Sequence, residues 1–161
     1  MNLMTWCKAA VTASAAVVLS AGPAWAAPSN SDLDVVRIDP DATFPGGETS
    51  LHAFVANLGP ETTNSTMTIT VELPRGTEAK APYFPDDCEA SGNGRRVRCE
   101  FPAGLKARRT ATAIVPIHLD QNLRPGTVLE GSFAVHSPDD RNPLNNRTTF
   151  EIRVIEPDSS H

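Results

Sequence analysis

Apolar and polar residues alternate strictly between positions 66 and 73 of this chain. A period of two with β-branched residues is typical of a half-buried β-strand. Residues 49–58 show a similar pattern, and Gly59-Pro60 ends that run before the next begins. The inward residues predicted for these two strands are Leu51, Ala53, Val55, Met67, Ile69, Val71 and Leu73, with Asn57 at a strand end. His52 and Phe54 are expected on the outer face.

Six further strands follow from the same pattern. They are predicted at residues 33–38, 107–119, 129–135 and 149–154, and as the two arms of a short hairpin within residues 88–101. The adjacent Val35 and Val36 break the alternation, which indicates a bulge or an edge strand. Pro116 falls on the outward set and cannot donate a hydrogen bond, so its strand should have an open side or a bulge there. The other inward residues are Ala111, Ala113, Val115, Ile117, Leu119, Leu129, Gly131, Phe133, Val135, Phe150, Ile152 and Val154.

The spacing of these strands predicts the fold class. Turn clusters rich in Gly, Pro, Asn and Asp separate the strands, and residues 77–87 are expected to be irregular. No segment after the N-terminus has a helical period. Short alternating strands of this kind predict an all-β, immunoglobulin-like antiparallel β-sandwich of about seven strands over residues 32–156, between a polar lead (27–31) and a polar tail (157–161).

The N-terminus is typical of a secretory signal peptide over residues 1–26. Lys8 precedes an apolar run over residues 9–19, and Ala24 and Ala26 supply the small residues of an A-x-A cleavage site. An N-terminal membrane anchor is the alternative, but the run is short for a span and no later segment approaches about 20 apolar residues. We therefore expect a secreted, extracellular protein with no membrane span after cleavage.

The charge of the chain argues against one class of partner. The whole chain has a formal net charge of −5; residues 1–26 hold one of its 14 Lys and Arg and none of its 19 Asp and Glu, so cleavage leaves −6. A mildly acidic domain lacks the overall basic footprint of a nucleic-acid-binding protein. No nucleic-acid partner is therefore expected.

Cys88 and Cys99 are the only cysteines after residue 26. An even count in a secreted chain indicates a disulfide, and a turn at Gly92-Asn93-Gly94 would bring the two hairpin arms together. The alternative is a metal site, which would need two more ligands close by. The aliphatic core is expected to lie elsewhere in the chain.

Four motifs occur in order along the mature chain. They are Asn57-Leu58-Gly59-Pro60, Leu73-Pro74-Arg75-Gly76, Cys88 with Val97-Arg98-Cys99, and Asp140-Arg141-Asn142-Pro143-Leu144-Asn145-Asn146. As an ordered set they resemble the bacterial secreted repeat family called domain of unknown function eleven, here in a single copy. The resemblance implies an immunoglobulin-like sandwich on secreted or cell-surface proteins, often in tandem arrays with adhesive or structural roles.

Polar side chains that could bind a ligand gather at two places. Asp139, Asp140 and Asn142 begin the densest group of oxygen ligands, which Asn145 and Asn146 complete; such a loop could hold Ca²⁺, or its Asx residues could hydrogen-bond their own backbone in a structural corner. A second group, Arg95, Arg96 and Arg98 on the hairpin and Arg108 and Arg109 before the next strand, could bind anions. The alternative for the hairpin arginines is pairing with Glu89 and Glu100.

Tyr83 and Phe84 lie between two prolines and form the best candidate for an exposed aromatic pair. They could bind a partner or a sugar, or they could cover one end of the core.

Catalytic motifs are not recognisable in the sequence. His52, His118, His136 and His161 are scattered, and Asp86, Asp87 and Glu89 cluster without a pattern that would line a cleft. We therefore expect a secreted, non-catalytic module without a cofactor that acts through an unknown protein or cell-envelope component. The alternatives are a small-ligand or carbohydrate-binding module and, from another class, an enzyme.

Overall fold

The computed structural model describes residues 27–157, so the expected signal peptide and the last four residues lie outside the described residues. The chain forms two antiparallel β-sheets packed face to face, which confirms the all-β, immunoglobulin-like sandwich. The first sheet has the strand order β1 (Leu33–Val36), β2 (Glu48–Asn57), β7 (Thr110–Leu119) and β4 (Thr77–Ala79). The second has the order β5 (Cys88–Ser91), β6 (Arg96–Phe101), β3 (Met67–Glu72), β8 (Val128–His136) and β9 (Arg147–Arg153).

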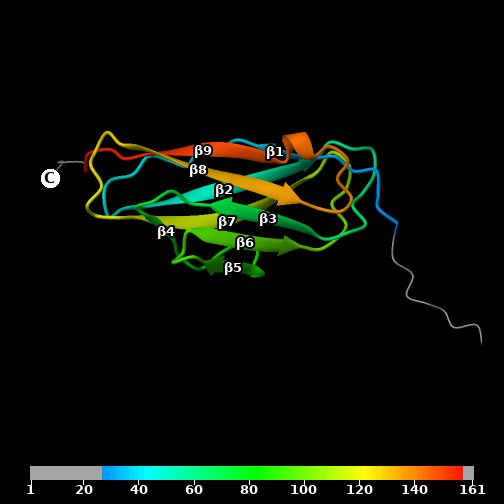
Figure 1. The fold of residues 1–161 in the computed structure, drawn as a ribbon, viewed down its shortest axis with the longest axis horizontal. Coiled ribbons are helices and arrows are strands. Elements are labelled where there is room, and N and C mark those ends of the chain that lie inside the picture. Colours follow the sequence, from blue (N-terminus) through cyan, green and yellow to red (C-terminus); the bar gives the residue numbers. More distant parts are fainter. Residues whose placement is uncertain (1–26, 158–161) are drawn as a thin grey trace, which may run out of the picture.

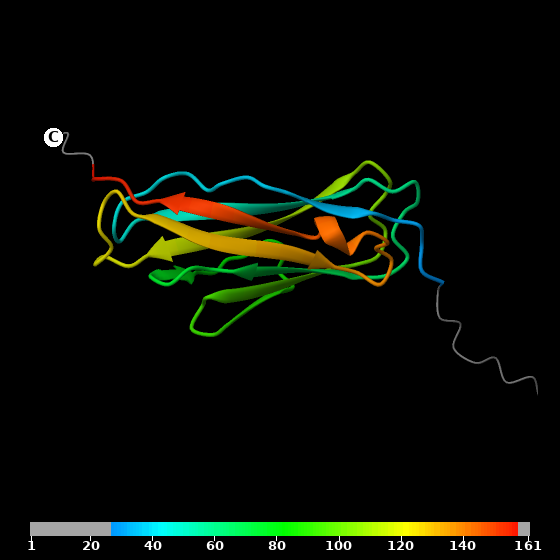
Figure 2. The ribbon, with the colours of Figure 1, turned by 45° about the horizontal axis from the view of Figure 1, so that its top comes forward.

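Residues 27–157 contain nine strands where the sequence predicted about seven. The main difference is β4, a three-residue strand within the segment expected to be irregular, which pairs with the end of β7. One 3-10 turn, η1 (Pro143–Asn145), precedes β9. Within the described part of the chain, no helix is long and apolar enough to cross a membrane. The two layers are visible in Figure 1, and Figure 2 shows the β5–β6 hairpin projecting from one edge.

The core lies between the two sheets and consists largely of the predicted inward residues. Cross-strand register places Leu51 opposite Val115 in the first sheet and Val71 opposite Phe133 in the second, all essentially inaccessible to solvent. Ala111 and Leu129 are the predicted inward residues that are only half-buried. Each fully buried aliphatic side chain of this size stabilises the fold by about 1.5–3 kcal/mol.

The hairpin forms as the sequence predicted. Cys88 lies directly opposite Cys99 and the two are joined by a disulfide, while Gly92, Asn93 and Gly94 take positive φ angles of 60°, 57° and 71° in the turn. The expectation that the core lies elsewhere was wrong for this segment. Cys99 is fully buried and Cys88 nearly so, and both belong to the main hydrophobic cluster. β6 is an interior strand beside β3, so its inward side chains reach the core.

Two expectations about irregular strands are also confirmed. The carbonyl of Pro116 accepts a hydrogen bond from Lys80 N at 2.9 Å, just where β4 ends at Ala79. N–H and C=O of one strand residue point to the same side, so the missing donor of Pro116 falls where the ladder stops. Val36 lies on β1, which pairs only with β2 and is therefore an edge strand.

Two buried polar side chains close the end of the sandwich where β2 terminates. Asn57 donates to the carbonyls of Glu61 and Leu105 at 2.7 and 3.0 Å, and its Oδ1 accepts from Asp32 N and Gly59 N. A Cβ at Gly59 would stand 2.6–2.7 Å from backbone atoms of the incoming N-terminal segment, so the close approach of the two segments requires glycine. The Asn-Leu-Gly-Pro motif is thus a structural corner.

Asp139, in the loop that follows β8, closes the same end of the sandwich. Its carboxylate accepts from Ser29 N and Ser65 Oγ at 3.1 and 3.0 Å, and from Asn64 N and Ser65 N at 2.5 and 2.6 Å. Ser29 and Ser31, which the sequence assigns to the polar lead, are buried against this residue. The lead is therefore packed onto the sandwich, while the boundary at residue 32 stays a prediction.

Candidate functional site

Tyr83 and Phe84 lie in the connection between β4 and β5, alongside β7. Phe84 exchanges two backbone hydrogen bonds with Ile114, at 3.1 and 2.8 Å, so this point of the connection extends the four-stranded sheet past the end of β4. Side chains of successive extended residues point to opposite faces. Tyr83 accordingly packs against the core, whereas the Phe84 side chain lies outside and is 58% exposed. Burial raises the pKa of Tyr83, and the nearby Glu78 raises it further.

The outer face of the four-stranded sheet brings Phe84 together with other apolar side chains. One cross-strand row joins Val36, Phe54 and Thr112, and the next joins His52, Ile114 and Phe84. Val36 is 40% exposed and Ile38, just beyond it, is 43% exposed, while Phe54 and Ile114 are half-buried. We call the set Val36, Ile38, Phe54, Phe84 and Ile114 the apolar face.

His52 extends the apolar face toward one end of the sheet. Its ring lies 6.1 Å from the ring of Phe54, with the two planes 22° apart. Beside it runs a groove of about 370 Å³, lined by Ile38, Asp39, Asp41, Glu48 and neighbours.

Within that groove Asp39 is already engaged. Arg37 donates to its carboxylate at 3.1 Å, and this bond lowers the pKa of Asp39. Asp41 and Glu48, which also line the groove, are exposed. The groove thus has an acidic side, and its other side borders the apolar face at Ile38.

The hairpin arginines lie on the outer face of the other sheet, away from Phe84. Arg96 pairs with Glu72 at 3.0 Å, a partner that the sequence did not suggest. Arg98 pairs with Glu100 at 3.1 Å along the same strand and lies opposite Glu89 in register. Surface ion pairs of this kind satisfy charge in a solvated face and add little stability.

Arg95 lies in the hairpin turn, where its carbonyl accepts from Leu73 N at 2.7 Å. Arg108 and Arg109 lie in the turn before β7, at the far end of the first sheet from Glu48. The structure therefore separates the two arginine groups, which the sequence analysis had considered as one anion-binding face.

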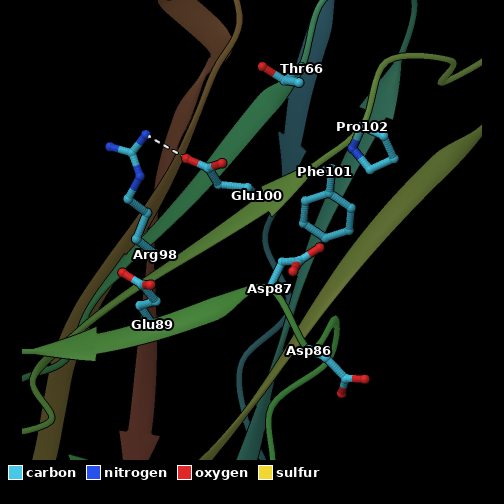
Figure 3. A pocket seen from close by; sticks show the side chains of 8 residues that line it. All are labelled: Thr66, Asp86, Asp87, Glu89, Arg98, Glu100, Phe101 and Pro102. Atoms are coloured by element: carbon cyan, nitrogen blue, oxygen red, sulfur yellow. Dashed lines mark hydrogen bonds and ion pairs between the residues drawn. The ribbon is translucent and has the colours of Figure 1, made fainter.

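A depression of about 590 Å³ lies where β5 and β6 meet the connection after Phe84. Asp86, Asp87 and Glu89 line it, although the sequence shows no cleft-lining pattern around them. Its other lining residues are Thr66, Arg98, Glu100, Phe101 and Pro102. Figure 3 shows the Asp86 carboxylate turned away from the Arg98–Glu100 pair, so the acidic groups do not converge on one point.

The loop that begins at Asp139 uses its oxygens mainly within the protein. Burial alone would raise the pKa of Asp139, but the hydrogen bonds from Ser65, Ser29 and Asn64 outweigh burial and lower it. Asp140 accepts from Leu33 N and from Asn142 N, both at 3.1 Å.

Asn146 also donates to Asp140, and Asn142 is exposed. Asn145 Oδ1 and Asn146 Oδ1 are buried without a donor among the described residues. No group of three or more His, Cys, Asp and Glu side chains in residues 27–157 is arranged to hold a metal ion. This geometry fits the structural corner, one of the two readings that the sequence left open for the loop.

The apolar face is the feature that sequence reasoning missed. Alternation along the sequence puts Phe54 and Ile114 on the outward sides of their strands, and Phe84 was a candidate for exposure. Their adjacency depends on β2 lying beside β7 and on the Phe84–Ile114 bridge, contacts between residues far apart in sequence. The available signal was the presence of large apolar residues at outward positions of two predicted strands.

No protein-family model matches the chain, and no curated protein does. The likeness to the repeat family named above therefore stays a resemblance of motifs, within a fold that is shown to be immunoglobulin-like.

Several solved structures share the fold. A CARDB domain from Pyrococcus furiosus, solved in complex with di-metal ions, is 16% identical, with a TM-score of 0.54, over 82% of this chain and 100% of that chain. The third cohesin of ScaC from Acetivibrio cellulolyticus, in complex with the ScaB dockerin, is 12% identical, with a TM-score of 0.51, over 76% and 99% of the two chains. The seventh ScaB type I cohesin from Pseudobacteroides cellulosolvens is 13% identical, with a TM-score of 0.52, over 81% and 97%. At these identities the likeness shows the fold alone.

Proposed function

We propose that this chain is a secreted, non-catalytic binding module that docks a protein through its apolar face. The observation that carries the proposal is the gathering of three exposed hydrophobic side chains, Val36, Ile38 and Phe84, around the half-buried Phe54 and Ile114 on one side of one sheet. Exposed apolar patches rimmed by polar residues are typical of interaction sites. Aromatic side chains at the centre of such patches contribute most of the binding energy.

Three further points support the proposal. One structural neighbour is a cohesin solved with a dockerin bound, so this fold can serve protein binding. The N-terminal sequence is typical of a secreted protein. His52 and His118 lie on one sheet and His136 on the other, so these described histidines do not form one group. This separation supports the non-catalytic part of the proposal.

The test compares binding by two variants of the mature protein. Phe84→Asp places a charge in the apolar face, and Leu144→Asp places the same charge on a side chain that is 93% exposed in η1, outside that face. We expect Phe84→Asp to weaken binding to purified envelopes of the producing cell by at least about tenfold. Leu144→Asp should bind as the wild type does. Equal binding by all three proteins would contradict the proposal.

A carbohydrate-binding function is the second candidate, because Phe84 presents an exposed ring beside Ile114 and His52. Aromatic faces pack on apolar surfaces of ligands, and sugars offer such surfaces. Titration with a panel of cell-wall oligosaccharides, followed by amide chemical shifts, separates the candidates. Shifts centred on Phe84 at millimolar sugar would favour this function over protein docking.

A further inference from the structure

The apolar face has two ends of opposite charge. At one end, Asp41, Glu48 and Asp120 are exposed around the start of β2 and the end of β7. The turn at the other end of β7 carries three exposed basic residues, Lys106, Arg108 and Arg109. Charges at the two ends of one surface favour a partner with the reverse polarity.

A few charges depart from this polarity. Lys80, near the acidic end, is held by Glu78 at 2.8 Å. Asp34 lies opposite Ala56 near the basic end and is half-buried. Arg37 pairs with Asp39 at the acidic end, and Glu61 is exposed beside Asn57 at the basic end. With these charges included, Asp41, Glu48 and Asp120 keep the first end acidic, and the exposed Lys106, Arg108 and Arg109 outnumber Glu61 at the second.

We propose that the apolar face binds the apolar face of a second copy of this chain, with the strands of the two copies running antiparallel across the interface. The inference rests on the docking surface proposed above and names its partner. A two-fold axis lying in the interface, across the strands, reverses the strand direction of the second copy. It therefore places the acidic end of each copy over the basic end of the other, as a self-complementary interface requires.

The centre of the face also fits this axis. His52 stands midway between Glu48 and Ala56 on β2, and its cross-strand row continues through Ile114 to Phe84. An axis along this row brings Phe84 of one copy against Phe84 of the other. The largest exposed ring of the face is then covered by an equivalent ring, in the way aromatic pairs prefer to pack.

The size of the face sets the strength of the dimer. The four strands β1, β2, β7 and β4 have 4, 10, 10 and 3 residues, and at about 4.8 Å by 3.3 Å per residue they give roughly 430 Å² per copy. A standard stable interface buries about 800 Å² per partner. The dimer should therefore be weak, with association visible between roughly 10 µM and 1 mM.

Sedimentation of the mature protein over that concentration range is the first test. The wild type and Leu144→Asp should shift from monomer toward dimer, and Phe84→Asp should weaken association by at least about tenfold. A wild type that stays monomeric at 1 mM, or a Phe84→Asp variant that dimerises equally well, would overturn the inference. If the wild type is monomeric but Phe84→Asp still loses envelope binding, the dimer fails while the proposed docking surface stands.

Charge reversal tests the antiparallel arrangement. The acid-end variant Asp41→Lys/Glu48→Lys and the basic-end variant Arg108→Glu/Arg109→Glu should each be monomeric alone, since like charges then face each other. Their equimolar mixture should form heterodimers, because each reversed end meets an opposite charge. Dimers in either variant alone, or none in the mixture, would contradict the arrangement. A short bis-maleimide should join Phe84→Cys copies and should leave Leu144→Cys copies monomeric.

Discussion

The two outer faces of this sandwich are built from the same alternation but differ in their chemistry. The outer face of the five-stranded sheet carries charges that pair with one another, such as Arg96 with Glu72 and Arg98 with Glu100. The outer face of the four-stranded sheet carries Phe84 and Val36, which have no polar group to offer water. A paired charge is stable in solvent, whereas covering an exposed apolar ring lowers the free energy of the system. This difference is the reason for proposing the docking surface on the four-stranded sheet.

The largest expected effect concerns the hairpin at the edge of the charged face. Replacing both Cys88 and Cys99 with serine should lower the free energy of unfolding by about 4 kcal/mol. Closure of a loop with a sequence separation of 11 contributes about 3 kcal/mol, and burying two hydroxyls in the core adds about 1 kcal/mol. Urea unfolding measures the loss. Binding through the apolar face should be unchanged, and a parallel loss of binding would show that the two faces are not independent.

The next effect concerns the end of the sandwich that Asp139 closes. Asp139→Ala removes the acceptor of four hydrogen bonds, so the buried N–H of Ser29 and the part-buried N–H groups of Asn64 and Ser65 lose their partner. We expect a loss of about 3 kcal/mol in the free energy of unfolding. Asn142→Ala, an exposed residue of the same loop, serves as the control and should cost far less. Hydrogen exchange should show faster exchange near Ser65 in the Asp139 variant and little change at Ile114.

Acid titration sharpens the role of the same residue. The pKa of Asp139 is lowered in the folded state, so the ionised carboxylate stabilises the fold above its unfolded pKa of about 4. That contribution is lost as the pH falls through the lowered folded value. Thermal unfolding between pH 7 and pH 2 should show a stability loss below about pH 4 that is smaller in Asp139→Asn. An identical acid profile in the two proteins would contradict this assignment.

The smallest effect concerns the charged face itself. A double-mutant cycle of Arg96→Ala and Glu72→Ala should give a coupling energy of about 0.5 kcal/mol that shrinks in high salt. Neither variant should change binding or dimerisation. A tenfold loss of binding in Arg96→Ala would move the docking surface to the five-stranded sheet and reverse the comparison.

Much of the fold was predictable because the alternation that marks a strand is visible within a few consecutive residues. The inward residues of β2, β3 and β9 follow the period of two, and the Gly-Asn-Gly turn supplies the backbone freedom that the hairpin needs. β4 was missed because three residues are too few to show a period. The candidate site was only partly predictable, because the sequence suggested Phe84 together with Tyr83 and the hairpin arginines. The structure separates them: Phe84 lies on the outer face of the four-stranded sheet, Tyr83 packs against the core, and the arginines lie on the outer face of the other sheet.

By itself, the sequence determined which residues alternate, where the turns fall and which cysteines can meet, because these properties depend on neighbours within a few positions. Only the tertiary structure decided that β2 lies beside β7, that Ser29 reaches Asp139 and that Phe84 joins Ile114. Those contacts bring together residues that are from 30 to 110 positions apart in the chain. A surface is formed by such long-range neighbours, and the pattern along one strand carries no information about which strand will lie next to it.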